Sequence, residues 1–70
     1  MDLLEARFKR RKTQWDLSKT AGISQSKLSL LERGYVTPSD KERALIANAL
    51  GFRVEEIEWQ VEQNGNLNVR

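Results

Sequence analysis

One stretch of 22 residues constrains the fold more than any other part of the chain. It runs from Thr13 to Gly34 and reads TQWDLSKTAGISQSKLSLLERG. Thr13 and Ser24 are N-cap residue types that each start a short helical pattern, and Gly22 lies between the two patterns. The residue after a helix C-terminus commonly needs a positive φ, which glycine adopts without a Cβ clash. The stretch therefore predicts two helices joined by a sharp turn.

A first helix is expected before this stretch, over residues 3 to about 12. Asp2 is placed to cap its N-terminus, and its apolar stripe is expected to consist of Leu3, Leu4 and Phe8. After the central stretch, Ser39 and Glu42 form a capping-box pattern for a helix that ends at Leu50.

The remaining residues divide into a last helix and a tail. A short fifth helix is expected from Val54 to about Trp59, and residues 60–70 lose the helical pattern. We expect those last residues to be a short flexible tail, with an edge strand formed on dimerisation as the alternative. The sequence thus predicts an all-α fold of five helices, with one domain over residues 1–59, its two-helix motif at about 13–34, and a tail.

Composition excludes several classes of protein. The chain has 70 residues, enough for one small domain, and it has no cysteine or histidine, which removes disulfides, thiolate nucleophiles and the commonest transition-metal ligands. No apolar run approaches the ~20 residues that a membrane span needs, and no nucleophile–base pair or phosphate loop is recognisable. We expect a soluble, cytoplasmic protein that is not an enzyme and binds no metal or cofactor.

Charge is distributed unevenly along the chain. The net charge is +2, but residues 1–38 hold eight Lys/Arg against four Asp/Glu, whereas residues 39–70 hold four against six. Five of the six residues from Arg7 to Lys12 are basic. Cations in a last helical turn complement the helix dipole, but five exceed what capping needs. The excess favours a surface that faces phosphate.

The expected helix after Ser24 has one face suited to close approach. Leu28 and Leu31 are spaced to point inward, and the other face carries Gln25, Ser26, Lys27, Ser29 and Leu30. Solvated helix faces more often carry Glu and Lys, whereas short amides and hydroxyls suit contact with another surface. This pattern favours a helix that enters a DNA groove.

These features together resemble the Cro and lambda-repressor class of helix-turn-helix regulators. The resemblance extends from about Leu3 to Ile57 and rests on TQ, the glycine turn, GIS, the ERG triplet, PS and IANALG, in the order and spacing typical of that class. It implies a compact five-helix, lambda-repressor-like domain that binds double-stranded DNA in a prokaryotic, phage or plasmid setting. Arg11 and Lys12 replace a common Gly-Leu turn, and Arg53 replaces a common serine cap before the fifth helix.

The resemblance also implies roles for individual residues. Base reading is expected from Gln25 and Ser26, with Ser29 one turn further along and Leu30 either touching a thymine methyl group or simply exposed. Phosphate contacts are expected from Gln14, Lys27, Arg33, Gly34, Arg10 and Lys12. Solvated charge is the alternative for Lys27 and Arg33. Arg7 and Glu32 match a pair that forms a buried salt bridge between the first and third helices.

Two functions from different classes follow. The first is a sequence-specific transcriptional regulator, a repressor that binds an inverted-repeat operator as a homodimer with half-site centres ~34 Å apart. The alternative is an antitoxin-like protein that neutralises a partner protein, with DNA binding secondary. The acidic C-terminal half motivates this alternative, together with the apolar residues Tyr35, Trp59, Val61 and Leu67.

Overall fold

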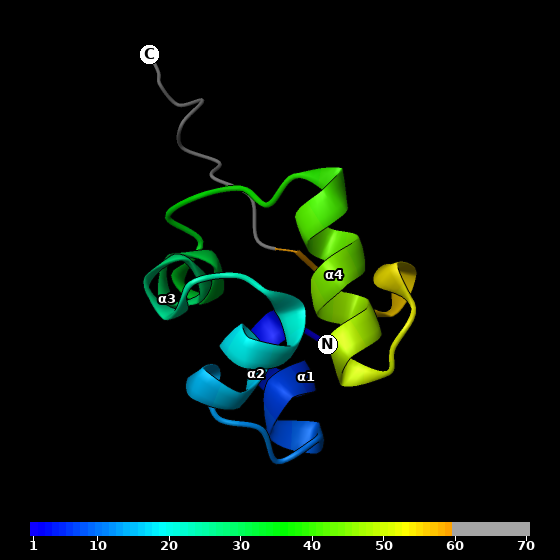
Figure 1. Ribbon diagram of the computed structural model, residues 1–70. Coiled ribbons are helices and arrows are strands. Elements are labelled where there is room, and N and C mark those ends of the chain that lie inside the picture. The colour runs from blue at the N-terminus through cyan, green and yellow to red at the C-terminus, as the bar shows by residue number, and fades with distance from the viewer. Residues whose placement is uncertain (60–70) are drawn as a thin grey trace.

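The computed structural model describes residues 1–59, which form a layered arrangement of short helices (Figure 1). The α-helices are α1 (Leu3–Lys9), α2 (Gln14–Ala21), α3 (Gln25–Arg33) and α4 (Asp40–Leu50), and η1 is a 3₁₀ turn at Val54–Glu56. Within residues 1–59 the only extended pairing is one parallel bridge between Asp2 and Glu58. The prediction of an all-α fold is confirmed. The expected tail, including Val61 and Leu67, lies outside the described residues.

The helices begin at the residues that the caps predict. The side chains of Asp2, Thr13, Ser24 and Ser39 each accept a hydrogen bond from the backbone N–H three residues later, at 2.8 to 3.1 Å. Gly22 has φ 74° and ends α2 in the left-handed conformation that disfavours any residue with a Cβ. The sharp turn that sets α3 against α2 therefore depends on glycine at this position.

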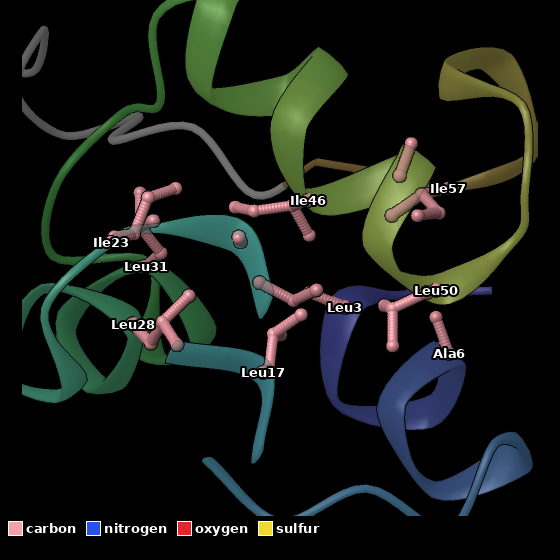
Figure 2. Close-up of a cluster of buried hydrophobic side chains, with 11 residues drawn as sticks. Leu3, Ala6, Leu17, Ile23, Leu28, Leu31, Ile46, Leu50 and Ile57 are labelled. Carbon is pink, nitrogen blue, oxygen red and sulfur yellow. The ribbon is translucent and has the colours of Figure 1, made fainter. Parts of the chain in front are cut away.

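The core lies where the four helices meet (Figure 2). Its fully buried large side chains are Leu17 of α2, Leu28 of α3 and Ile46 of α4. The other buried apolar residues are Leu3, Ala6, Ala21, Ile23, Leu31, Ala47, Leu50 and Ile57. Because Leu28 and Leu31 fix one side of α3 in this core, the opposite side of α3 is left facing outward.

The expected apolar stripe of the first helix is wrong in two of its three members. Leu3 is buried, but Leu4 is 41% and Phe8 is 64% exposed. The inward side of α1 is instead made by Leu3, Ala6 and Arg7. Arg7 displaces the expected hydrophobic contact because its guanidinium has a buried carboxylate partner on α3.

The expected fifth helix is also shorter than the prediction. Only Val54–Glu56 are helical, as one 3₁₀ turn, and Ile57 has the extended angles φ −107° and ψ 131°. This extended backbone places Ile57 in the core at 3% exposure and lets the Glu58 N–H donate to the Met1 carbonyl at 2.6 Å. Burying Ile57 and pairing Glu58 with the chain's start outweigh continuation of the helix.

The connection between α1 and α2 contains a residue in an unfavourable conformation. Arg11 has φ 56°, and it is the only non-glycine residue with positive φ in residues 1–59. Side chains with a Cβ lose about 1–2 kcal/mol in this region. The turn therefore has the geometry that the Gly-Leu pattern would supply, although arginine occupies the position.

No helix within the described residues is long and apolar enough to cross a membrane.

Candidate nucleic-acid interface

The outward side of α3 borders an open depression on the surface. Its lining residues are Gln14 from α2 and Gln25, Ser26, Ser29 and Leu30 from α3. The structure thus brings together all four residues for which base reading is expected, and it adds the first residue of α2. The lining offers amides, hydroxyls and one leucine that is 37% exposed, with no charged group. Such a surface can accept and donate hydrogen bonds without a strong field.

A chain of hydrogen bonds runs from α1 to the rim of this depression. Arg7 Nε donates to Glu32 Oε2 at 2.6 Å, and Gln14 Nε2 donates to Glu32 Oε1 at 2.9 Å. Gln25 Nε2 then donates to Gln14 Oε1 at 3.3 Å. The side chain of Gln25, which is half-buried, is therefore oriented by groups in α1, α2 and α3.

The Arg7–Glu32 ion pair lies at the buried end of this chain. The side chains of Arg7 and Glu32 are 10% and 7% exposed, and Arg7 Nη1 also donates to the Lys12 carbonyl at 2.8 Å. The pair joins α1, the loop that follows it and α3, as the resemblance implies. Removing one partner of a buried pair commonly costs about 3–5 kcal/mol, because the other charge stays buried.

Lys27 has an acidic partner on α4. Its Nζ atom lies 2.8 Å from Glu42 Oε2 of α4, and the two side chains are 43% and 21% exposed. The hydrogen bond from Lys27, followed by that from the backbone N–H of Ser39, lowers the pKa of Glu42 below its ordinary value. The side chain that sequence analysis assigns to DNA or to solvent thus has an acidic partner within the chain.

Arg10 has partners that account for it without DNA. Its Nε atom donates to the Leu50 carbonyl at 2.7 Å and its Nη2 atom donates to the Gly51 carbonyl at 3.3 Å. The guanidinium also lies over the Phe52 ring, 4.0 Å from the centroid. Arg10 therefore caps the C-terminus of α4, where a cation also complements the helix dipole.

The other expected phosphate ligands differ in their availability. Within residues 1–59, the exposed side chains of Lys12 and Arg33 make no ion pair. The Gly34 N–H donates to the Leu31 carbonyl at 3.2 Å, and the Tyr35 N–H donates to the Leu30 carbonyl at 2.9 Å. Both amides are thus used in ending α3, whereas the cations of Lys12 and Arg33 have no ion pair within residues 1–59.

Two residues of α4 have contacts that the sequence does not predict. The sequence predicts only the capping-box role of Glu42, because nothing in it brings Glu42 beside Lys27, 15 positions earlier. Arg43 forms a long contact with Asp40 at 3.7 Å, and its buried Nε atom has no hydrogen-bond partner within the described residues. Both residues lie in the first turns of α4, so the N-terminus of α4 carries charges that the pattern of α3 alone does not reveal.

No group of three or more potential metal-ligating side chains occurs within residues 1–59.

Comparison with known protein families gives one match: the model of a family described as helix-turn-helix matches residues 3–57, which is most of the chain. Comparisons with curated proteins and with solved structures gave no match.

Proposed function

The chain belongs to the Cro/CI type of the helix-turn-helix family, whose members are DNA-binding transcription regulators, and from this premise we propose that it is a sequence-specific repressor. In this proposal two copies bind an inverted repeat, and each places α3 in the major groove. The family match over residues 3–57 carries the DNA-binding part of the proposal. The depression beside α3 supports the choice of the surface that reads bases. We call this surface, lined by Gln14, Gln25, Ser26, Ser29 and Leu30, the reading surface.

Gln25 is proposed as the main base-reading residue. Glu32 only accepts hydrogen bonds, so the Gln14 amide must turn its nitrogen to Glu32 and its oxygen to Gln25. Gln25 then uses one N–H on Gln14, which leaves its carbonyl oxygen and its second N–H for a base. Adenine offers the complementary pair, a donor at N6 beside an acceptor at N7, and such a contact discriminates by about 1–3 kcal/mol.

The remaining lining residues would add less discrimination. The hydroxyls of Ser26 and Ser29 both donate and accept, so they tolerate several bases. Leu30 is exposed enough to reach a thymine methyl group. The proposed readout is therefore strong at the base that meets Gln25 and relaxed at its neighbours.

Phosphate contacts are proposed for Gln14, Lys12 and Arg33. Gln14 lies at the first residue of α2, beside the reading surface, whereas Lys12 and Arg33 carry exposed cations without ion pairs in residues 1–59. Lys9 and Arg11 are exposed and strengthen the positive field near Lys12. Arg10 and Gly34 are left out of this set because the Nε and Nη2 atoms of Arg10 hold the end of α4 and the Gly34 N–H holds the end of α3.

The direct test is selection of bound duplexes from a random-sequence pool at several salt concentrations. We expect a two-fold symmetric motif whose half-site centres lie about one helical turn apart. Affinity should fall as salt rises, because bound Lys and Arg release counterions from the DNA. Selected sequences without any shared motif would contradict base-specific binding, and an asymmetric motif would contradict the homodimer on an inverted repeat.

A partner protein remains the second candidate function, in which the chain is an antitoxin-like module. The supporting observation is that Leu4 and Phe8, one turn apart on α1, are 41% and 64% exposed, with Tyr35 at 60%. Trp59 supports it less, because it is half-buried and its Nε1 atom donates to the Val54 carbonyl at 3.2 Å. Purification from the native host decides between the two: a stoichiometric partner protein favours this candidate, and a homodimer that binds DNA without one opposes it.

A further inference from the structure

Glu42 connects the N-terminus of α4 with α3. Its Oε1 atom accepts a hydrogen bond from the Ser39 N–H at 2.9 Å, and its Oε2 atom lies 2.8 Å from Lys27 Nζ. Lys27 is the only basic residue in the first two turns of α3, QSKLSLL. The one cation on that part of the helix is therefore held by a carboxylate of the same chain.

We propose that Glu42 competes with DNA phosphate for Lys27 and thereby limits the sequence-independent part of DNA binding. The inference rests on the proposed function, because a helix lying in a groove is what brings Lys27 close to the phosphate backbone. A phosphate oxygen and a carboxylate oxygen both accept from an ammonium group. For Lys27 to neutralise a phosphate fully, it must leave Glu42 or be shared with it.

This competition lowers the affinity for DNA of any sequence and leaves the reading of bases unchanged. Phosphate contacts contribute affinity for every sequence, whereas base contacts carry the discrimination. Holding Lys27 weakens binding to all duplexes but leaves Gln25 and its hydrogen-bond partners unchanged. Because the same phosphate contact is weakened in specific and nonspecific complexes, both lose affinity by the same factor. Glu42 is thus assigned as a residue that limits the affinity for DNA of any sequence and acts through Lys27.

The charges around α3 agree with this assignment. The first turn of α4 carries two acidic residues, and each lies near one basic side chain. Glu42 lies near Lys27, and Asp40 lies 3.7 Å from Arg43. Of the two basic residues in α3, only Arg33 has no ion pair within residues 1–59. Residues 40–43 carry two acidic and two basic side chains, so the start of α4 adds no net positive charge beside α3, and Glu42 offsets the charge of Lys27.

The test begins with Glu42→Gln, which keeps an oxygen for the Ser39 N–H but removes the negative charge. Glu56→Gln is the matched control, because Glu56 also caps a helical turn, accepting from the Arg53 N–H at 2.7 Å. That turn, η1, lies across α4 from α3 (Figure 1). Binding to a mixed-sequence duplex is measured by fluorescence anisotropy over a range of salt, and thermal unfolding verifies that each variant is folded.

We expect Glu42→Gln to bind the mixed-sequence duplex more tightly than Glu56→Gln does. The plot of log K against log salt should become steeper by about 0.9, so the gain should shrink roughly 3.5-fold for a fourfold rise in salt. Lys27→Gln should change little in the wild-type background and should abolish the gain in the Glu42→Gln background. This dependence on Lys27 is what a purely structural role of Glu42 would not produce.

Several results would overturn the inference. One is a folded Glu42→Gln variant that binds the duplex no more tightly than Glu56→Gln does. Another is a Lys27→Gln substitution that, made alone, reduces the steepness of the plot of log K against log salt by about 0.9. If Glu42→Gln does not fold, the Lys27→Gln variant still decides, because an unchanged slope supports the competition and a reduced slope excludes it. Absence of salt-dependent binding by the wild type to any duplex would instead overturn the proposed function.

Discussion

Gln14 Nε2 donates to Glu32 Oε1 at 2.9 Å, and this hydrogen bond links the stability of the fold to the orientation of the reading surface. The same carboxylate accepts from Arg7 Nε at 2.6 Å through its other oxygen. Glu32 therefore holds α1 against α3 and also sets which end of the Gln14 amide meets Gln25. A change at Glu32 is expected to alter both folding and readout.

Loss of the Arg7 guanidinium should destabilise the protein severely. We expect Arg7→Met to lower the free energy of unfolding by about 3–5 kcal/mol, because the Glu32 carboxylate would remain buried without its cation. Urea denaturation measures this loss. The double variant Arg7→Met with Glu32→Leu should recover a large part of it, since neither charge is then buried. A single variant within about 1 kcal/mol of the wild type would show that the pair is not buried as described.

Replacing Arg11 with glycine should raise the stability of the protein. Its φ of 56° costs a residue with a Cβ about 1–2 kcal/mol, and glycine gives back part of this gain through the greater freedom of the unfolded chain. We expect Arg11→Gly to raise stability by about 0.5–1 kcal/mol, which for a domain of this size raises Tm by several degrees. Arg11→Ala removes the same charge but keeps a Cβ. If both variants melt at the same temperature, relief of backbone strain is not the cause.

A substitution at Arg10 should affect stability, whereas one at Lys12 should affect DNA binding. We expect Arg10→Met to cost about 1.5–3 kcal/mol of stability, because the carbonyls of Leu50 and Gly51 lose a charged donor. Lys12→Gln should leave Tm unchanged but reduce the salt slope of DNA binding by about 0.9. Calorimetry and anisotropy measure the two effects. The reverse pattern would return Arg10 to the DNA surface.

Gly22 and Arg10 show which contacts the sequence can predict and which it cannot. Gly22, Thr13, Ser24 and Ser39 act within one turn of chain, so their identities sufficed to place the helix ends. Arg10 finds its partners at Leu50 and Gly51, 40 and 41 positions later. These contacts could not be predicted, because no local pattern shows which other helix ends beside Arg10, and its expected contact with phosphate stays a prediction.

The reading surface and its surroundings differ in the same way. The residues on the outward side of α3 follow from helical periodicity, and the structure places Gln25, Ser26, Ser29 and Leu30 around one depression. The sequence does not predict the contact of Glu42 with Lys27, because it depends on the fold bringing the start of α4 beside α3. The fifth helix was overestimated because its local pattern carries no sign of the pairing between Glu58 and the start of the chain.

Glu42 should make stability depend on pH in the acid range. Lys27 and the Ser39 N–H lower its pKa below the ordinary 4.5, so its folded-state pKa lies below that of the unfolded chain. Such a group stabilises the native state above about pH 4.5, and this stabilisation is lost as pH falls through the lowered pKa. Urea midpoints between pH 3 and 6 measure it. We expect the urea midpoint of Glu42→Gln to fall less steeply than that of the wild type as pH is lowered. Asp16 accounts for part of the remaining fall, because its pKa is also lowered, chiefly by the hydrogen bond from the Thr13 N–H. Equal declines in both proteins would exclude the contribution of Glu42.

The most direct test of the account is the base preference of Gln25→Ala. Competition binding with the selected duplex and with its single-base variants measures the discrimination at each position. We expect the wild type to prefer adenine at one position in each half-site by about 1–3 kcal/mol, and the variant to lose that preference there while keeping its salt slope. A folded Gln25→Ala protein that retains the full preference at every position would contradict the proposal that Gln25 reads the DNA.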